Sequence, residues 1–422
     1  MSTTPVSTSR TTWILPFAAT LIAMFTLQLS NLGFSPLLPS IQREFGMSYT
    51  QLGLFTAIYG LLALALSVPA GLSAKWLGER WVLGAGLIGV AAGSVLLGEA
   101  WNFESAIAFR GLTIFGYRFA FVSVLVAVAM TAPLSLRGRT MGIVGATSAL
   151  ASVVGAPLGG LLVRDFTWRV AILGYAAMAV LGAIVFWTFY RPTPADPSGA
   201  GDPEHGPAGD GASAGGRRSA FRSPVVWMLA LIVGLGGFGQ FSVTYFVPSV
   251  VDSLYGLDSF AAGVIISTGY VAAIVVNLIV GVLADRFNKL AVLAVLFAIL
   301  SVASASMSVE DLTTFRVASA GVLAFGFSAA NQLYGLAGSL MPRREAANAM
   351  GVVSLGAGLF GYFGPQMLGF LRDATGSFAA GFYMVAIADV LTLGLILLLY
   401  RMIRARRAAG DVSGTIPSGV RA

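Results

Sequence analysis

The chain has 422 residues, of which 57% are hydrophobic and only 10% charged, and its mean hydropathy is +0.84. These values exclude an ordinary water-soluble domain and indicate a protein that lies in a membrane. There is no cysteine, and the one histidine, His205, lies in a hydrophilic segment. The apolar part of the chain therefore excludes Cys/His metal sites, a serine–histidine relay and a haem-ligating histidine.

Apolar stretches recur along the whole chain, and a helix needs about 20 such residues to cross a bilayer. They predict twelve membrane helices, at residues 13–38, 49–74, 81–99, 104–133, 140–163, 168–190, 224–251, 258–284, 289–308, 312–340, 346–371 and 377–400. The first stretch is too long for the hydrophobic segment of a secretory signal, so we interpret it as a retained helix. The sequence therefore predicts an all-α membrane protein without a metal or any other cofactor.

Residues 192–223 separate the sixth predicted helix from the seventh and are rich in Pro, Gly, Ala, Ser and Asp. Such a composition cannot bury a core, so we expect a flexible cytoplasmic linker. The linker divides the chain into an N-terminal six-helix half at residues 1–191 and a C-terminal six-helix half at 224–408, which is followed by a cytoplasmic tail at 409–422.

The net charge of +7 follows from the membrane topology. Most of the 25 Lys and Arg residues fall on the two tails and on the loops of one side, and such basic loops stay in the cytoplasm. We therefore expect a multi-pass protein of a bacterial-type inner membrane with both termini in the cytoplasm. The charge requires no nucleic-acid partner, because basic loops beside an anionic lipid leaflet explain it.

The second half of the chain repeats the first. Pro39-Ser40 matches Pro248-Ser249, and Arg164-Asp165 matches Arg372-Asp373, at a shift of about 210 residues. A six-plus-six duplication around a hydrophilic linker is typical of transporters whose two halves, related by a pseudo-twofold axis, rock about a central substrate site.

Two short motifs carry a family resemblance. "GLSAKWLGER" at 71–80 and "GVLADRFNK" at 281–289 each follow the second helix of a half. They resemble the G-x-L-a-D-r-x-G-r-k loop of the major facilitator superfamily, and "GAPLGG" (155–160) and "GPQMLG" (364–369) are similar to its fifth and eleventh helices. The resemblance implies a monomeric secondary transporter, not an enzyme, built from two six-helix bundles.

The resemblance also implies that the two loops help to hold one state of the transport cycle. The residues expected in this conformational role are Gly71, Lys75, Gly281, Asp285 and Arg286. The first loop departs from the family pattern, because Lys75 stands where the family has aspartate, whereas the second loop keeps Asp285.

Arg118 lies in the middle of the fourth predicted helix, about 20 Å from either end at ~1.5 Å per residue. An arginine at that depth costs about 2.5–3.5 kcal/mol, so it should face protein or a water-filled cavity. Its guanidinium suits a carboxylate or another oxyanion, which it can bind with two parallel hydrogen bonds. The alternative is a structural arginine bonded to carbonyl or amide groups of a neighbouring helix.

Further polar side chains lie on the first, fourth, seventh and tenth predicted helices, which line the central cavity in the family that the chain resembles. We expect them to bind the substrate together with Arg118; they are Gln28, Asn31, Tyr117, Gln240, Tyr245, Asn331 and Gln332. Each one alone is more typical of a hydrogen bond between helices than of a ligand contact. As a group they match a mostly apolar pocket with a few oriented polar groups.

Two charged residues are candidates for coupling to protons. Arg110 resembles the arginine of the fourth helix in the family, although its side chain, like that of Arg316, could instead reach the lipid headgroups. Asp389 is the only acidic residue deep in a predicted helix, and burial favours its protonated form. It could also be a neutral or locally paired residue of an outer helix.

The sequence thus predicts a secondary active transporter of a small organic anion of the carboxylate type, which works by proton symport or by anion exchange. The alternative is a proton-driven exporter of drugs or metabolites, which the aromatic content and the glycine–proline helices would suit. Scarcity of carboxylates in the predicted helices weakens this alternative, because cation exporters need negative charge in the cavity.

Overall fold

The computed structural model describes residues 13–131, 137–191, 224–339 and 343–408. The predicted linker at 192–223 and tail at 409–422 lie outside the described residues. The first bundle consists of α1 (Ile14–Leu32), the short helices η1 (Ser35–Leu37) and α2 (Leu38–Phe45), α3 (Tyr49–Leu77), α4 (Glu79–Gly98), α5 (Phe103–Thr131), α6 (Arg137–Asp165) and α7 (Trp168–Phe189). The second consists of α9 (Pro224–Tyr255), α10 (Ser259–Arg286), α11 (Lys289–Ser306), α12 (Leu312–Ser339), α13 (Arg343–Thr375) and α14 (Ala379–Ala408).

The helices confirm the predicted all-α class, and each predicted span coincides with a long helix. Eleven helical segments of the described chain are long and apolar enough to cross a membrane. The remaining predicted span, 346–371, lies in α13, which is not among the eleven. Helix α13 contacts both α3 and α9 and so faces protein on two sides, which reduces the apolar surface that it needs.

The first span is longer than predicted, because the chain stays helical beyond residue 38 as far as Phe45. Pro36 and Pro39 each occupy one of the first two positions of a short helix, where a missing N–H group costs no hydrogen bond. Gly46, with a φ of 59°, ends α2 in the left-handed conformation that glycine adopts without strain. The predicted end at residue 38 is therefore too early, because the helical chain continues to Phe45 and ends at Gly46.

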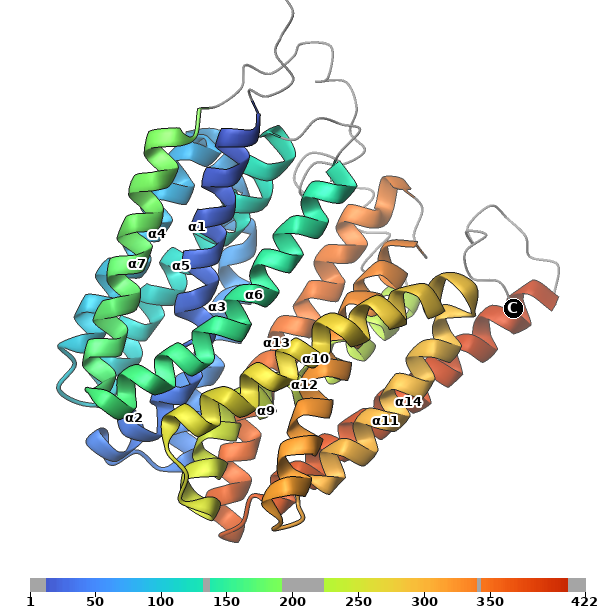
Figure 1. The fold of residues 1–422 in the computed structure, drawn as a ribbon. Helices are drawn as coiled ribbons and strands as arrows, with labels where there is room; N and C mark the ends of the chain where they lie inside the picture. Colours follow the sequence, from blue (N-terminus) through green and yellow to red (C-terminus); the bar gives the residue numbers. More distant parts are fainter. Residues whose placement is uncertain (1–12, 132–136, 192–223, 340–342, 409–422) are drawn as a thin grey trace, which may run out of the picture.

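Figure 1 shows the two bundles side by side, the first in blue to green and the second in yellow to red. The start of α1 and the end of α14 lie on the same side of the molecule, which we call the terminal face. Helix α2 lies on the other side, which we call the opposite face. The two bundles approach each other toward the opposite face and spread apart toward the terminal face (Figure 1).

Two helix pairs, α3 with α13 and α6 with α10, join the bundles. Glycines bring the backbones together, because a Cβ on Gly60 would lie 2.6 Å from the nitrogen of Tyr362. On the other pair, a Cβ on Gly263 would lie 2.4 Å from the carbonyl oxygen of Ala156. Small residues allow this approach in membrane helices, where packing rather than water drives association.

Polar contacts fasten the two bundles at the opposite face. The Asp373 carboxylate at the end of α13 accepts hydrogen bonds from the backbone N–H groups of Tyr49 and Thr50 at 3.1 and 2.7 Å. Those N–H groups begin α3 and carry the positive end of its dipole, so a carboxylate is favourable there. Arg43 also forms an ion pair with Asp252 at 2.9 Å, which links α2 to α9.

The same helix pairs are apart near the terminal face. A Cβ added to Gly71 of α3, Gly351 of α13, Gly145 of α6 or Gly281 of α10 would meet no atom of another element within 4 Å. The two bundles are therefore sealed at the opposite face and separated at the terminal face. The predicted conformational residues lie on this separated side, where Lys75, Asp285 and Arg286 are exposed.

Candidate functional site

Helix α5 carries Arg118 into the region between the two bundles. The side chain is half-buried, and its guanidinium carbon lies 4.5 Å from the ring centroid of Tyr59 on α3. Its Nε is buried without a hydrogen-bond partner, and Arg118 forms no ion pair with any described carboxylate. The expected alternative, an arginine bonded to carbonyls or amides of a neighbouring helix, finds no support among the described residues.

Tyr117 fixes this part of α5 against its neighbours. Its hydroxyl donates a hydrogen bond to Oε1 of Gln28 on α1. Its ring lies 5.8 Å from the rings of both Tyr59 and Phe121, with the Phe121 ring stacked on it. Because aromatic packing and the hydrogen bond act from opposite ends of the side chain, Tyr117 holds α1, α3 and α5 in a fixed relation.

The second bundle reaches the same region through aromatic side chains. The ring of Phe241 on α9 lies 6.4 Å from that of Tyr59. The hydroxyls of Tyr245 on α9 and Tyr334 on α12 interact electrostatically with Arg118. The cluster around Arg118 is therefore built from both halves of the chain. The geometry of such a site changes when the two halves move relative to each other.

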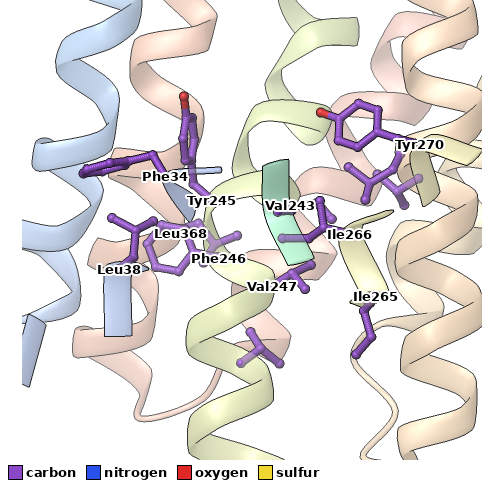
Figure 2. Packing of buried hydrophobic residues seen from close by; sticks show 14 of the residues in the cluster. Phe34, Leu38, Val243, Tyr245, Phe246, Val247, Ile265, Ile266, Tyr270 and Leu368 are labelled. Atoms are coloured by element: carbon purple, nitrogen blue, oxygen red, sulfur yellow. The ribbon is translucent and has the colours of Figure 1, made fainter. Parts of the chain in front are cut away.

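The two buried tyrosines of the second bundle turn their hydroxyls away from the hydrophobic core. In Figure 2 the Tyr245 hydroxyl points away from Phe246 and Leu368. The Tyr270 hydroxyl points toward α9 (Figure 2), where Thr244 is within its hydrogen-bonding reach. Apolar packing below these rings thus orients polar groups at one level of the molecule.

Arg110 lies two turns earlier on α5 and is only 4% exposed. Its guanidinium carbon lies 3.6 Å from the ring centroid of Phe34, and its Nε is buried without a partner. It interacts electrostatically with Tyr245 and Tyr59. The alternative in which Arg110 extends to the lipid headgroups is wrong, because the side chain packs into protein; Arg316, its counterpart in the second half, is exposed.

The structure groups some of the predicted binding residues and leaves others apart. Tyr117 and Tyr245 interact with Arg118, and Gln28 joins them through its hydrogen bond with Tyr117. Asn331 is exposed and donates to Oδ1 of Asn277 at 3.3 Å, within the second bundle. Half-buried side chains that show no contact with Arg118 among the described residues are Asn31, Gln240 and Gln332.

Asp389 lies outside this cluster. It is 2% exposed and accepts a hydrogen bond from Ser304 of α11 at 2.8 Å. A Cβ on Gly239 of α9 would lie 3.8 Å from its Oδ1, so the carboxylate faces the glycine-rich part of that helix. The expectation of a local partner is confirmed by Ser304, and the coupling role stays a prediction.

Two aromatic residues of the site were not among the predicted binding residues. Tyr59 connects Arg110, Arg118 and Tyr117, yet it lies on α3, outside the four helices expected to line the cavity. Phe34 stacks on Arg110 from the junction after α1. The aromatic stretch FGYRFAF around Arg118 was the signal in the sequence that aromatic rings surround this arginine.

The arrangement suits an anion more than any other ligand class. Two arginines and several phenol hydroxyls face one region, and no described carboxylate pairs with either arginine. No cluster of His, Cys, Asp and Glu suited to a metal ion occurs among the described residues. A cavity of about 790 Å³ elsewhere, between α11 and α12, is lined by aliphatic side chains such as Val295 and Val302 and carries no charged group.

The known sequences that resemble this chain include transporters. The sequence profile of the Major Facilitator Superfamily matches residues 20–365. An uncharacterized transporter of Bacillus subtilis (strain 168), YybO, is 25% identical over 86% of this chain and 87% of its own length. A probable nitrate transporter of Staphylococcus aureus (strain MRSA252), NarT, is 24% identical over 87% of this chain and 91% of its own.

Solved structures show the same fold. A bacterial homologue of the human lysosomal transporter Spinster, crystallised in an inward-facing and unoccupied conformation, aligns with a TM-score of 0.79 at 16% identity, over 93% of this chain and 98% of the other. The inward-facing and occupied form of such a homologue aligns with a TM-score of 0.75 at the same identity, over 92% and 96% of the two chains.

Proposed function

Because this chain belongs to the Major Facilitator Superfamily of transporters, we propose that it carries a small organic anion of the carboxylate type through alternating access of its two halves. The observation that carries the proposal is Arg118, a half-buried arginine whose Nε has no partner and which no described carboxylate neutralises. A partly buried charge without a partner is unfavourable, so an anionic ligand would stabilise this position.

The surroundings of Arg118 support a carboxylate as the ligand. A planar guanidinium matches a carboxylate through two parallel hydrogen bonds, and phenol hydroxyls such as that of Tyr245 can donate further ones. The relative described as a probable nitrate transporter supports the wider class of anions. A cationic drug would meet two positive charges here, so the exporter alternative has no observation in its favour.

The route of access follows from the charge of the two faces. The start of α4 and the ends of α7, α10 and α14 lie on the terminal face. Arg80 lies in the first turn of α4, Arg191 follows α7, Arg286 ends α10 and Arg401 lies in the last third of α14. Because basic ends stay on the cytoplasmic side, we place the terminal face, and with it both termini, in the cytoplasm of a bacterial-type cell. The separated side of the molecule is then the inward-facing side, and one chain working as a monomer holds the complete pathway.

Coupling by proton symport and by anion exchange remain the two modes of this proposal. In symport, Asp389 would take up the proton, because it is the buried carboxylate closest to α9, a helix that reaches the Arg118 cluster through Phe241 and Tyr245. In exchange, a second anion would return the carrier without any proton. Asp389→Asn separates the two modes, because it would remove proton-driven accumulation and leave exchange intact.

A thermal-shift screen of the purified protein tests the ligand class. A ligand that binds only the folded protein at a hundred times its Kd adds about 2.7 kcal/mol of stability. We expect mono- and dicarboxylates to raise the melting temperature and lipophilic cations to leave it unchanged. Stabilisation by cations alone would refute the proposal, and stabilisation by nitrate alone would replace the organic anion with an inorganic one.

A further inference from the structure

We propose that the transported anion carries two negative groups, and that Arg110 binds the second one while Arg118 binds the first. This inference rests on the proposed function, because it assigns the substrate class of the same site. The inference goes beyond the proposed function because it makes Arg110 a binding residue, whereas the sequence suggested a coupling role for Arg110.

The placement of the two arginines on one helix supports a divided site. Arg118 follows Arg110 by two turns of α5, which is about 12 Å along the helix axis. Residues separated by two turns lie close to one face of a helix. Both side chains can therefore reach the same side of α5, at different depths between the bundles.

The guanidinium groups of Arg110 and Arg118 share an unsatisfied nitrogen atom. Each has a buried Nε with no hydrogen-bond partner. The Phe34 ring covers the face of the Arg110 guanidinium, but the N–H groups point outward in the plane and still need acceptors. Stacking thus holds the planar group in place without satisfying it.

The charge of the region favours a ligand with more than one negative group. Among the described residues, neither arginine has a carboxylate partner, and the buried Asp389 is bonded to Ser304 away from them. Leaving the buried Arg110 guanidinium and the half-buried Arg118 guanidinium unpaired is unfavourable, and most so for Arg110. A monoanion would neutralise one of them, whereas a dianion would neutralise both.

Two tyrosines interact with both positive groups. Tyr59 and Tyr245 each interact with both Arg110 and Arg118. Uncharged phenol side chains that neighbour both cations suit the polar or hydrocarbon middle of a short, linear molecule with an acidic group at each end. The substrate class that fits is a short-chain dicarboxylate.

The test compares succinate with butyrate, which have chains of the same length but differ by one carboxylate, on the full-length protein at neutral pH. We expect the wild type to bind succinate at least tenfold more tightly. Arg110→Gln should remove this preference by weakening succinate while changing the butyrate Kd less than about twofold. Arg118→Gln should weaken both, and Arg316→Gln, the exposed counterpart of Arg110 in the second half, should keep the preference.

Equal affinity of the wild type for succinate and butyrate would overturn the inference. This comparison needs no variant, so its result does not depend on whether Arg110→Gln folds. Loss of both ligands by the same factor in Arg110→Gln would make that arginine structural. Tighter binding of nitrate than of succinate would assign both arginines to one small anion. Failure of the proposed function itself would look different, since no anion would bind or Arg118→Gln would bind as the wild type does.

Discussion

Replacing Arg118 by glutamine is expected to weaken binding of the anionic substrate by about a hundredfold or more. A hydrogen bond to a charged group contributes about 1.5–3 kcal/mol, and a bidentate guanidinium supplies two. Each 1.4 kcal/mol is a factor of ten in Kd, so loss of both bonds gives a change of that size. Isothermal titration of the purified protein with the best anion from the thermal-shift screen measures it.

The Arg118→Lys variant separates charge from geometry. Lysine keeps the positive charge but donates as a point and cannot bind a carboxylate through a planar fork, so we expect a loss of about tenfold. Arg316→Gln is the control for removing an arginine charge, because Arg316 is an exposed arginine of the second half, outside the Arg118 cluster. Wild-type affinity in Arg118→Gln would show that Arg118 is structural and that the anion binds elsewhere.

Gly263→Val is expected to reduce transport by more than tenfold while the protein still inserts into the membrane. A Cβ at this position would lie 2.4 Å from the carbonyl oxygen of Ala156 and 2.9 Å from the Cα of Pro157. Both are backbone atoms that cannot turn aside, so α10 must move away from α6. Overpacking of this kind costs about 1–3 kcal/mol, and it acts on the seal between the bundles.

Opening of the seal can be detected directly because the chain has no cysteine. Ser259→Cys places a thiol at the opposite face, where the Ser259 carbonyl oxygen would lie 2.2 Å from a Cβ on Gly160. A membrane-impermeant maleimide should label this thiol faster in the Gly263→Val background. Gly394→Val is the control, since a Cβ there meets nothing within 4 Å. Unchanged labelling together with unchanged transport would show that the α6–α10 contact is not part of the seal.

The sequence predicted the elements of the fold well because the bilayer imposes one length on every helix that crosses it. It also predicted the repeat of six helices, since the paired motifs survive in both halves. The predicted first span ends at residue 38, where the apolar run ends, whereas the helical chain continues through the polar residues Gln42, Arg43 and Glu44 to Phe45.

The site was predicted in part. Counting residues along the predicted helices put Arg118 in the middle of its helix, which is where it lies in α5. Gln28 and Tyr117 were assigned only to helices expected to line the cavity, and the hydrogen bond between them was not predicted. The direction of each side chain around its helix did not follow, because helices with apolar residues on all sides show no distinct buried face. Tyr59 was not assigned as a binding residue for this reason. The Arg43–Asp252 ion pair could not be predicted because it depends on how the two bundles dock.

Counterflow in proteoliposomes tests most directly the claim that this chain carries an organic anion between two accessible states. Liposomes containing the purified protein and loaded with unlabelled succinate would be diluted into a trace of labelled succinate. We expect a transient accumulation of label inside, suppressed by excess external succinate and absent with Arg118→Gln. Entry of label no faster than into protein-free liposomes, with counterflow seen only for lipophilic cations or only for nitrate, would contradict it.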